Sequence, residues 1–218
     1  PFTSNWEKID ELLLNDEDFG KLLKMRNPLR EEMQNLSLNG LSTDEKIATL
    51  FTFLKQRISW NESYSLTAKD IRKAIKEGTA NNAVLNFIFM SMLREANIPA
   101  HPIVMSRRDR GIIPYSYPSL NKINTFIVGV QNSDSTMVFL DGSVIHGYID
   151  VLPPVLLTQR ARIVNNSPGD KWVSPVERDR SSVRSLIKVT ISEDGELQGN
   201  RESMMTGQYA SNFRRAYK

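Results

Sequence analysis

The chain has 218 residues, of which 40% are hydrophobic and 24% charged, a composition typical of a folded globular protein and not of a disordered one. Its 28 basic and 25 acidic residues leave a net charge of +3, and the scattered basic residues argue against nucleic-acid binding. The absence of cysteine excludes thiol catalysis, disulfides and thiolate metal sites, and no apolar run approaches the ~20 residues that span a bilayer.

Residues 1–41 predict a polar, helical N-terminal segment. Its first apolar face comprises Trp6, Ile9, Leu12 and Leu13. Ser42 and Glu45 then have the spacing of a capping box, which predicts that a helix begins there. One side of that helix carries Ile47, Leu50, Phe51, Leu54 and Ile58. A shorter helix is expected over Ala68–Glu77, begun by Thr67 and Asp70 and ended by Gly78.

Residues 80–96 form an apolar stretch that predicts a helix buried on nearly all sides. Asn97 suits the end of a helix, and Pro99 prevents its continuation. Alternating apolar residues then predict strands over 100–106, 123–131, 136–141 and 160–165. Ser133–Ser135 is expected to form a turn, Pro102 to lie at a strand start, edge or bulge, and 106–121 to be a long loop.

The C-terminal part predicts a hairpin followed by a helix. Residues 166–185 suggest a linker, 186–191 and 196–204 suggest two strands joined at Asp194-Gly195, and 207–218 suggest a helix. The expected organisation is therefore a helical segment at 1–41, a core at 42–170, and a linker with the start of a β module at 171–218. Because the chain begins at Pro1 without Met, we expect it to be part of a longer protein whose other domains are its partners.

Several short motifs occur in a defined order. Gly78-Thr79-Ala80 precedes the apolar helix, Leu93–Ala100 ends it, Ser106–Gly111 and Pro118–Thr125 follow, and Asp141 closes a later strand. Together they resemble the transglutaminase-like domains of large bacterial envelope proteins, which have a papain-like fold, and the resemblance covers about residues 40–218. It implies an α+β fold, with a central buried helix packed on an antiparallel sheet, and a periplasmic or extracellular location.

The resemblance also implies where catalytic residues belong. In that family a cysteine at the head of the helix, a histidine on the first strand and an aspartate on the next form the triad, and the matching positions here hold Ala80, Thr125 and Asp141. A methyl group and a hydroxyl cannot replace a thiol and an imidazole, and loss of such groups typically costs on the order of a millionfold in rate. We therefore expect an inactive domain, without cofactor or metal.

Three functions remain open on the sequence. The first is a binding or scaffolding module that holds a peptide or glycan in the former cleft, with Asn82, Arg107, Arg108 and Asn124 as candidate binding residues. The second is a hydrolase or acyltransferase with a rearranged site that uses Asp141 and His146. The third is a purely structural spacer. The other histidine, His101, is expected to be structural or half-exposed, and the spacing of His146 with its neighbouring aspartates does not match a recognised metal site.

Overall fold

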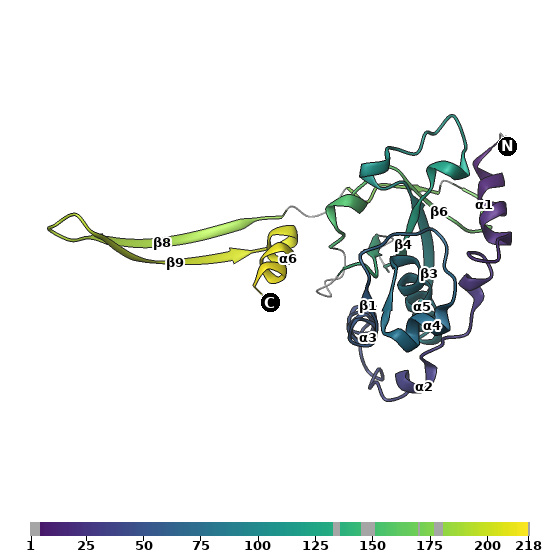
Figure 1. Ribbon diagram of the computed structural model, residues 1–218, viewed down its shortest axis with the longest axis horizontal. Helices are drawn as coiled ribbons and strands as arrows, with labels where there is room; N and C mark the ends of the chain where they lie inside the picture. Colours follow the sequence, from purple (N-terminus) through teal and green to yellow (C-terminus); the bar gives the residue numbers. More distant parts are fainter. Residues whose placement is uncertain (1–4, 133–135, 145–150, 170, 177–180, 218) are drawn as a thin grey trace. The chain divides into compact units, whose positions relative to one another are not determined.

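The computed structural model describes residues 5–132, 136–144, 151–169, 171–176 and 181–217. It divides into two compact units, Pro1–Glu177 and Arg178–Lys218. The first unit combines helices with an antiparallel sheet, which confirms the expected α+β class (Figure 1). None of the helices in the described part of the chain has both the length and the apolar character needed to cross a bilayer.

The first unit is organised around a five-stranded sheet with the order β5-β4-β3-β6-β7. Its strands are β3 (Ala100–Met105), β4 (Thr125–Gln131), β5 (Met137–Leu140), β6 (Ala161–Ile163) and β7 (Trp172–Val173), all paired antiparallel. Four of these confirm the predicted strands, whereas the expected turn at 133–135 lies outside the described residues. Pro102 lies within β3 and not at its start. Its carbonyl accepts from Val164 N, just beyond the end of β6, so its missing N–H faces the end of the β6 pairing and leaves the bonds to β4 intact.

Helix α5 (Asn82–Glu95) packs against β3, β4 and α3 (Figure 1). Every residue from Asn82 to Leu93 is buried, as the apolar stretch predicted. The helix begins two residues later than expected, because Ala80 belongs to a short strand, β2 (Thr79–Ala80), paired in parallel with β1 (Ser59–Trp60). Asn81 is the N-cap, and its side chain accepts from Val84 N at 2.9 Å.

Among the helices before α5, α3 packs directly against it. Helix α3 (Thr43–Arg57) has the predicted capping box, and the apolar side predicted for it is fully buried. Helix α4 (Ile71–Glu77) begins three residues later than expected. Asp70 has a left-handed backbone (φ 50°) and makes no side-chain cap, so it cannot continue a helix from Ala68. Gly78 ends α4 with φ 68°, as predicted.

The N-terminal segment contains α1 (Trp6–Asn15), η1 (Leu22–Lys24) and α2 (Arg30–Met33). Trp6, Ile9 and Leu13 are buried as expected, but Leu12 is 44% exposed because it lies on the outer side of α1. Buried charges hold α1 to the sheet. Asp10 accepts from Arg162 Nε at 3.0 Å and Nη2 at 2.8 Å on β6, and from Lys171 Nζ at 3.0 Å. We call these three residues the charge cluster.

The loop expected at 106–121 contains two short 3-10 turns, η2 (Arg108–Arg110) and η3 (Leu120–Lys122), and a third, η4 (Pro154–Leu156), precedes β6. The second unit contains β8 (Val183–Ile191), β9 (Leu197–Met205) and α6 (Gly207–Ala216). The predicted hairpin and helix are therefore confirmed. The linker expected over 166–185 is interrupted by β7 and ends earlier, because β8 begins at Val183.

Candidate functional site

The head of α5 meets the start of β4 through a buried amide. Asn82 Nδ2 donates to Thr125 Oγ1 at 2.7 Å and to Phe126 O at 3.3 Å. Its Oδ1 accepts from Ser65 N at 2.8 Å. Asn82 and Thr125 are both fully buried. The hydroxyl at the position expected for a catalytic base is thus engaged inside the protein.

One turn further along α5, Asn86 holds the carboxylate of Asp141. Asn86 Nδ2 donates to Asp141 Oδ1 at 2.8 Å and to Phe126 O at 2.8 Å, and its Oδ1 accepts from Gly142 N at 2.7 Å. Gly142 passes so close to α5 that a Cβ there would lie 2.3 Å from Leu85 Cβ. Asp141 is only 1% exposed, so this carboxylate is enclosed and hydrogen-bonded from α5.

The second carboxylate oxygen of Asp141 is bound by its own chain. Oδ2 accepts from Ser143 N at 2.9 Å and from the Ser143 hydroxyl, as expected for an aspartate that bonds nearby backbone N–H groups. Tyr64 OH donates to Ser143 Oγ at 3.0 Å, which extends a chain of hydroxyls away from the buried carboxylate. Burial raises the pKa of Asp141 and outweighs the hydrogen bonds from Ser143 and Asn86, which lower it.

Two further titratable groups surround Asp141. Burial lowers the pKa of Lys55 to about 8, although the negative charge of Asp141 opposes that shift. The Lys55 ammonium donates to Gly142 O at 2.5 Å. Burial, and then the charge of Asp141, raise the pKa of Tyr64 to about 12. At neutral pH these values leave Lys55 charged and Tyr64 protonated.

Ala80 lies two residues before Asn82, buried and paired with Trp60 across β1 and β2. Its carbonyl accepts from Asn61 N at 2.8 Å. The structure thus places Thr125 and Asp141 beside the first two turns of α5, at Asn82 and Asn86, and places Ala80 in the strand that leads into this helix. The arrangement can orient and neutralise buried polar groups, but its methyl and hydroxyl supply neither a thiol nor an imidazole.

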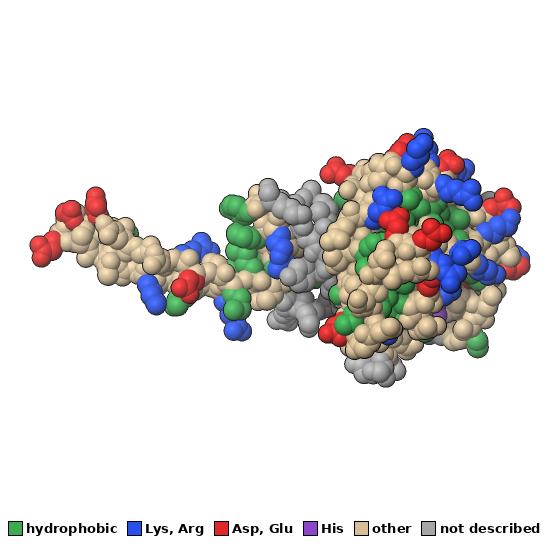
Figure 2. Space-filling model, turned by 90° about the horizontal axis from the view of Figure 1, so that it is seen from below, with side chains coloured by type: hydrophobic (Ala, Val, Ile, Leu, Met, Phe, Trp, Pro, Cys, Tyr) green, Lys and Arg blue, Asp and Glu red, His purple; other side chains and the backbone are tan. Residues whose placement is uncertain are grey.

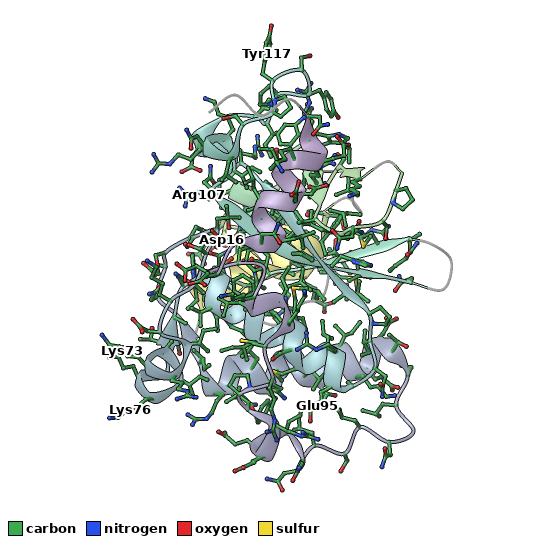
Figure 3. All side chains as sticks on the ribbon, turned by 90° about the vertical axis from the view of Figure 1, so that its right-hand side faces the viewer. Asp16, Lys73, Lys76, Glu95, Arg107 and Tyr117 are labelled. Carbon is green, nitrogen blue, oxygen red and sulfur yellow. The ribbon has the colours of Figure 1, made fainter. Side chains whose placement is uncertain are left out.

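The candidate binding residues have different surroundings. Asn124 braces a loop, because its Oδ1 accepts from Arg107 N at 3.1 Å and its Nδ2 donates to Ser106 Oγ at 3.1 Å. The Arg107 guanidinium lies over the Tyr64 ring at 5.0 Å and pairs with Asp109 at 2.9 Å. Figure 3 shows Arg107 between the Tyr117 end of the first unit and the Lys73 and Lys76 end. Asn82 is buried, and Arg107 and Asn124 are partly buried. Arg108 is exposed and is therefore the candidate binding residue most open to solvent.

Sequence reasoning missed Asn86, Ser143, Tyr64 and Lys55. One signal was present, because Asn82 and Asn86 are polar residues four apart at the start of an otherwise apolar helix and therefore lie on one face. His146 lies outside the described residues, so its predicted pairing with Asp141 is not described. Within the described ranges, no group of three His, Cys, Asp or Glu residues could hold a metal ion.

Comparison with known proteins gives one structural likeness. No protein-family model and no curated protein matches this chain. A solved structure from Parabacteroides distasonis, described as that of a "putative protease", superposes with a TM-score of 0.52 at 14% sequence identity. The match covers 77% of this chain and 30% of that one, so the chain spans less than a third of that protein's length. At this identity the likeness shows a related fold and carries no activity across.

Proposed function

We propose that this chain is a catalytically inactive transglutaminase-like domain that acts as a binding or scaffolding module in a larger envelope protein. The observation that supports it best is the state of Thr125 and Asp141. Both side chains are buried and have internal hydrogen-bond partners, supplied by Asn82, Asn86 and Ser143. The positions that would carry a base and its orienting carboxylate contribute instead to the packing of α5 on the sheet.

Acyl transfer by this kind of site needs a nucleophile, a base within hydrogen-bond reach, and donors for the oxyanion. Ala80 supplies a methyl group in place of the nucleophile, and the chain has no cysteine that could take its role. The Thr125 hydroxyl does not titrate near neutral pH and accepts a bond from Asn82. A fold related to that of a protein described as a "putative protease", without these groups, supports descent from an enzyme whose chemistry has been lost.

The enclosed network favours a rigid scaffold, and it leaves a peptide or glycan to be bound by side chains at the surface. The envelope location and the longer parent protein are parts of the proposal that rest on the resemblance of the motifs. The alternative of a rearranged hydrolase requires Asp141 to meet substrate, whereas this carboxylate is enclosed by Asn86, Gly142 and Ser143.

Because the chain has no cysteine, a single introduced thiol tests whether positions 80 and 125 form a catalytic pair. We would compare Ala80→Cys with Ala80→Cys/Thr125→His and measure the rate of iodoacetamide alkylation against pH. An imidazolium beside a thiol at a helix N-terminus lowers the thiol pKa, so the double variant should react at lower pH. Ser59→Cys, on the exposed side of β1, is the matched control and should not respond to Thr125→His.

A histidine at the buried position 125 can prevent folding, so a second variant accompanies it. Ala80→Cys/Asn82→Asp adds a negative charge two residues from the thiol and should raise the pH at which it reacts. The Asn82→Asp variant shows that the thiol responds to a nearby charge. If Thr125→His in folded protein leaves the pH profile of the thiol at position 80 unchanged, the assignment of the pair is wrong.

The unsubstituted protein should show no amine incorporation, deamidation or peptide hydrolysis, and turnover that Asp141→Asn abolishes would contradict inactivity. Binding is tested separately with a panel of peptides and oligosaccharides, using NMR shifts of the side-chain amide of Asn124 as the reporter. Saturable shifts support a binding module. Unchanged spectra restrict the proposal to scaffolding.

A further inference from the structure

The ribbon formed by β8 and β9 has one apolar and one polar face. The two strands pair from Val183 with Met205 to Ile191 with Leu197, and alternate residues point to opposite faces. The apolar face comprises Val183, Ser185, Ile187, Val189, Ile191, Leu197, Gly199, Arg201, Ser203 and Met205. The other comprises Arg184, Leu186, Lys188, Thr190, Gln198, Asn200, Glu202 and Met204. A face of this composition is typical of a sheet that buries one side.

Within its unit, this apolar face is covered only at one end. Helix α6 packs over the base of the ribbon and leaves a groove of about 720 Å³, lined from the strand side by Arg201, Ser203 and Met205. Toward the turn, Ile187 is 61% exposed and Ile191 73% exposed. A two-stranded ribbon is at best marginally stable in water, so burial of this face against further structure would stabilise it.

The two edges of the ribbon differ in their readiness to pair. Strand β8 carries five β-branched residues, at Val183, Ile187, Val189, Thr190 and Ile191, the residue types that favour strands. The middle of β9 reads Gly199-Asn200-Arg201-Glu202, which combines poor strand formers with charges of the kind that discourage edge pairing. Strand β8 therefore presents the edge suited to accept another strand.

Charge along the ribbon indicates which strand that is. The turn carries three acidic residues, Glu193, Asp194 and Glu196, whereas Arg184 and Lys188 on β8 are basic (Figure 2). A nine-residue strand is about 30 Å long, so two such strands paired antiparallel bring the acidic turn of one copy toward Arg184 at the base of the other, while Lys188 lies near the middle of each strand. A parallel arrangement would instead place like charges together.

We propose that β8 pairs antiparallel with β8 of a second copy of this chain, forming a four-stranded sheet. The valines and isoleucines of β8 in both copies then lie next to each other at its centre, on one continuous apolar face. The acidic turn of each copy lies toward Arg184 at the base of the other, which favours this direction of pairing. Interfaces of this kind gain orientation and salt dependence from their charges, and affinity from the buried apolar side chains.

Charge reversal in the full 218-residue chain tests the proposal. The turn variant is Glu193→Lys/Glu196→Lys, which leaves Asp194 and its bond to Ser192 in place. The base variant is Arg184→Glu/Lys188→Glu. Sedimentation equilibrium at low salt should show a dimer for the unsubstituted chain. Each variant alone should dissociate about tenfold more readily, because each places like charges at both ends of the pair. An equimolar mixture of the two should recover the affinity as a heterodimer.

Two further variants act as controls. Ile187→Lys replaces an exposed side chain and should abolish the dimer, whereas Lys73→Glu/Lys76→Glu changes charge equally on α4 and should leave it intact. A chain that remains monomeric at its highest soluble concentration overturns the proposal. So does a dimer that Ile187→Lys leaves unchanged, since it would use another surface. Failure of the mixed variants to recover would refute the antiparallel direction, and with it the proposed pairing.

Discussion

Replacing Asp10 with Asn should destabilise the first unit by about 3–5 kcal/mol. The Asp10 and Arg162 side chains are each 4% exposed and that of Lys171 is 10% exposed, so the charge cluster is almost fully removed from water. Asparagine keeps the size of the side chain and one acceptor oxygen, but removes the negative charge. Two buried cations then lie together with only the exposed carboxylate of Glu7 near them, which costs far more than the loss of an exposed ion pair.

The same figure follows from the individual hydrogen bonds. Asp10 accepts three bonds from charged donors, and each such bond contributes about 1.5–3 kcal/mol. An asparagine side chain can accept about one of these three hydrogen bonds in good geometry. Its amide N–H groups would face the N–H donors of Arg162 and Lys171. For a chain of this size, a loss of this magnitude corresponds to a fall in Tm of about 10 °C.

Urea unfolding followed by tryptophan fluorescence is the appropriate assay. All three tryptophans lie before residue 178, so the signal reports on the first unit alone. Trp6 and Trp172 also lie at the charge cluster, with ring centroids 5.0 Å apart and the Arg162 guanidinium 5.9 and 5.4 Å from their rings.

Glu7→Gln is the matched control for Asp10→Asn. Glu7 lies 3.6 Å from Arg162 Nη2 but is 71% exposed, so its loss should cost less than about 1 kcal/mol. Adding Lys171→Met to Asp10→Asn removes one uncompensated cation and should recover part of the stability. If Asp10→Asn costs no more than Glu7→Gln, the charge cluster does not hold α1 in the way described.

Three more predictions concern the buried site and a close backbone contact. Mass-spectrometric amine labelling across pH should show Lys55 half-reactive near pH 8. In Asp141→Asn the half-reactive pH of Lys55 should be lower, because the carboxylate charge raises the pKa of Lys55. Half-reactivity above pH 10 would contradict the burial of Lys55. The pKa of Asp141 is raised on folding, so its contribution to stability is present below its ordinary value of 3.8 and lost as pH rises through the folded value. Urea titrations should therefore show a smaller loss of unfolding free energy between acidic and neutral pH in Asp141→Asn, and an unchanged loss would refute the shift. Gly20→Ala should lower the free energy of unfolding by about 1–3 kcal/mol or more in the same assay, because its Cβ would lie 1.9 Å from Leu14 O. Gly40→Ala meets open space and should lower it by about 1 kcal/mol because of its positive φ. Equal losses for the two variants would refute the clash at Gly20.

Local patterns predicted much of the fold. The capping box of Ser42 and Glu45 and the period of the apolar residues after it located α3, and an apolar stretch located α5. The errors arose where distant segments compete with local preference. Ala80 could not be recognised as a strand residue, because its partner Trp60 is twenty residues away and the pair forms only in the folded chain.

The site was predictable only in part, for the same reason. The order of the motifs pointed to Thr125 and Asp141, and the sequence showed that Ala80 and Thr125 stand where the family has its cysteine and histidine. It could not show that Asn86 would be the residue to hold Asp141. That contact joins a helix to a strand end 55 residues later, and its strength depends on burial that only packing creates.

The charge cluster also has a mechanical consequence. Asp10 belongs to the first helix of its unit, while Arg162 and Lys171 belong to the final strands of the five-stranded sheet and the loop between them. Tension applied between these early and late segments would therefore act first on the charge cluster. The buried helix α5 would stay unstrained until the ion pairs of the cluster broke. The charge cluster would in this way bear tension applied between the two ends of the first unit.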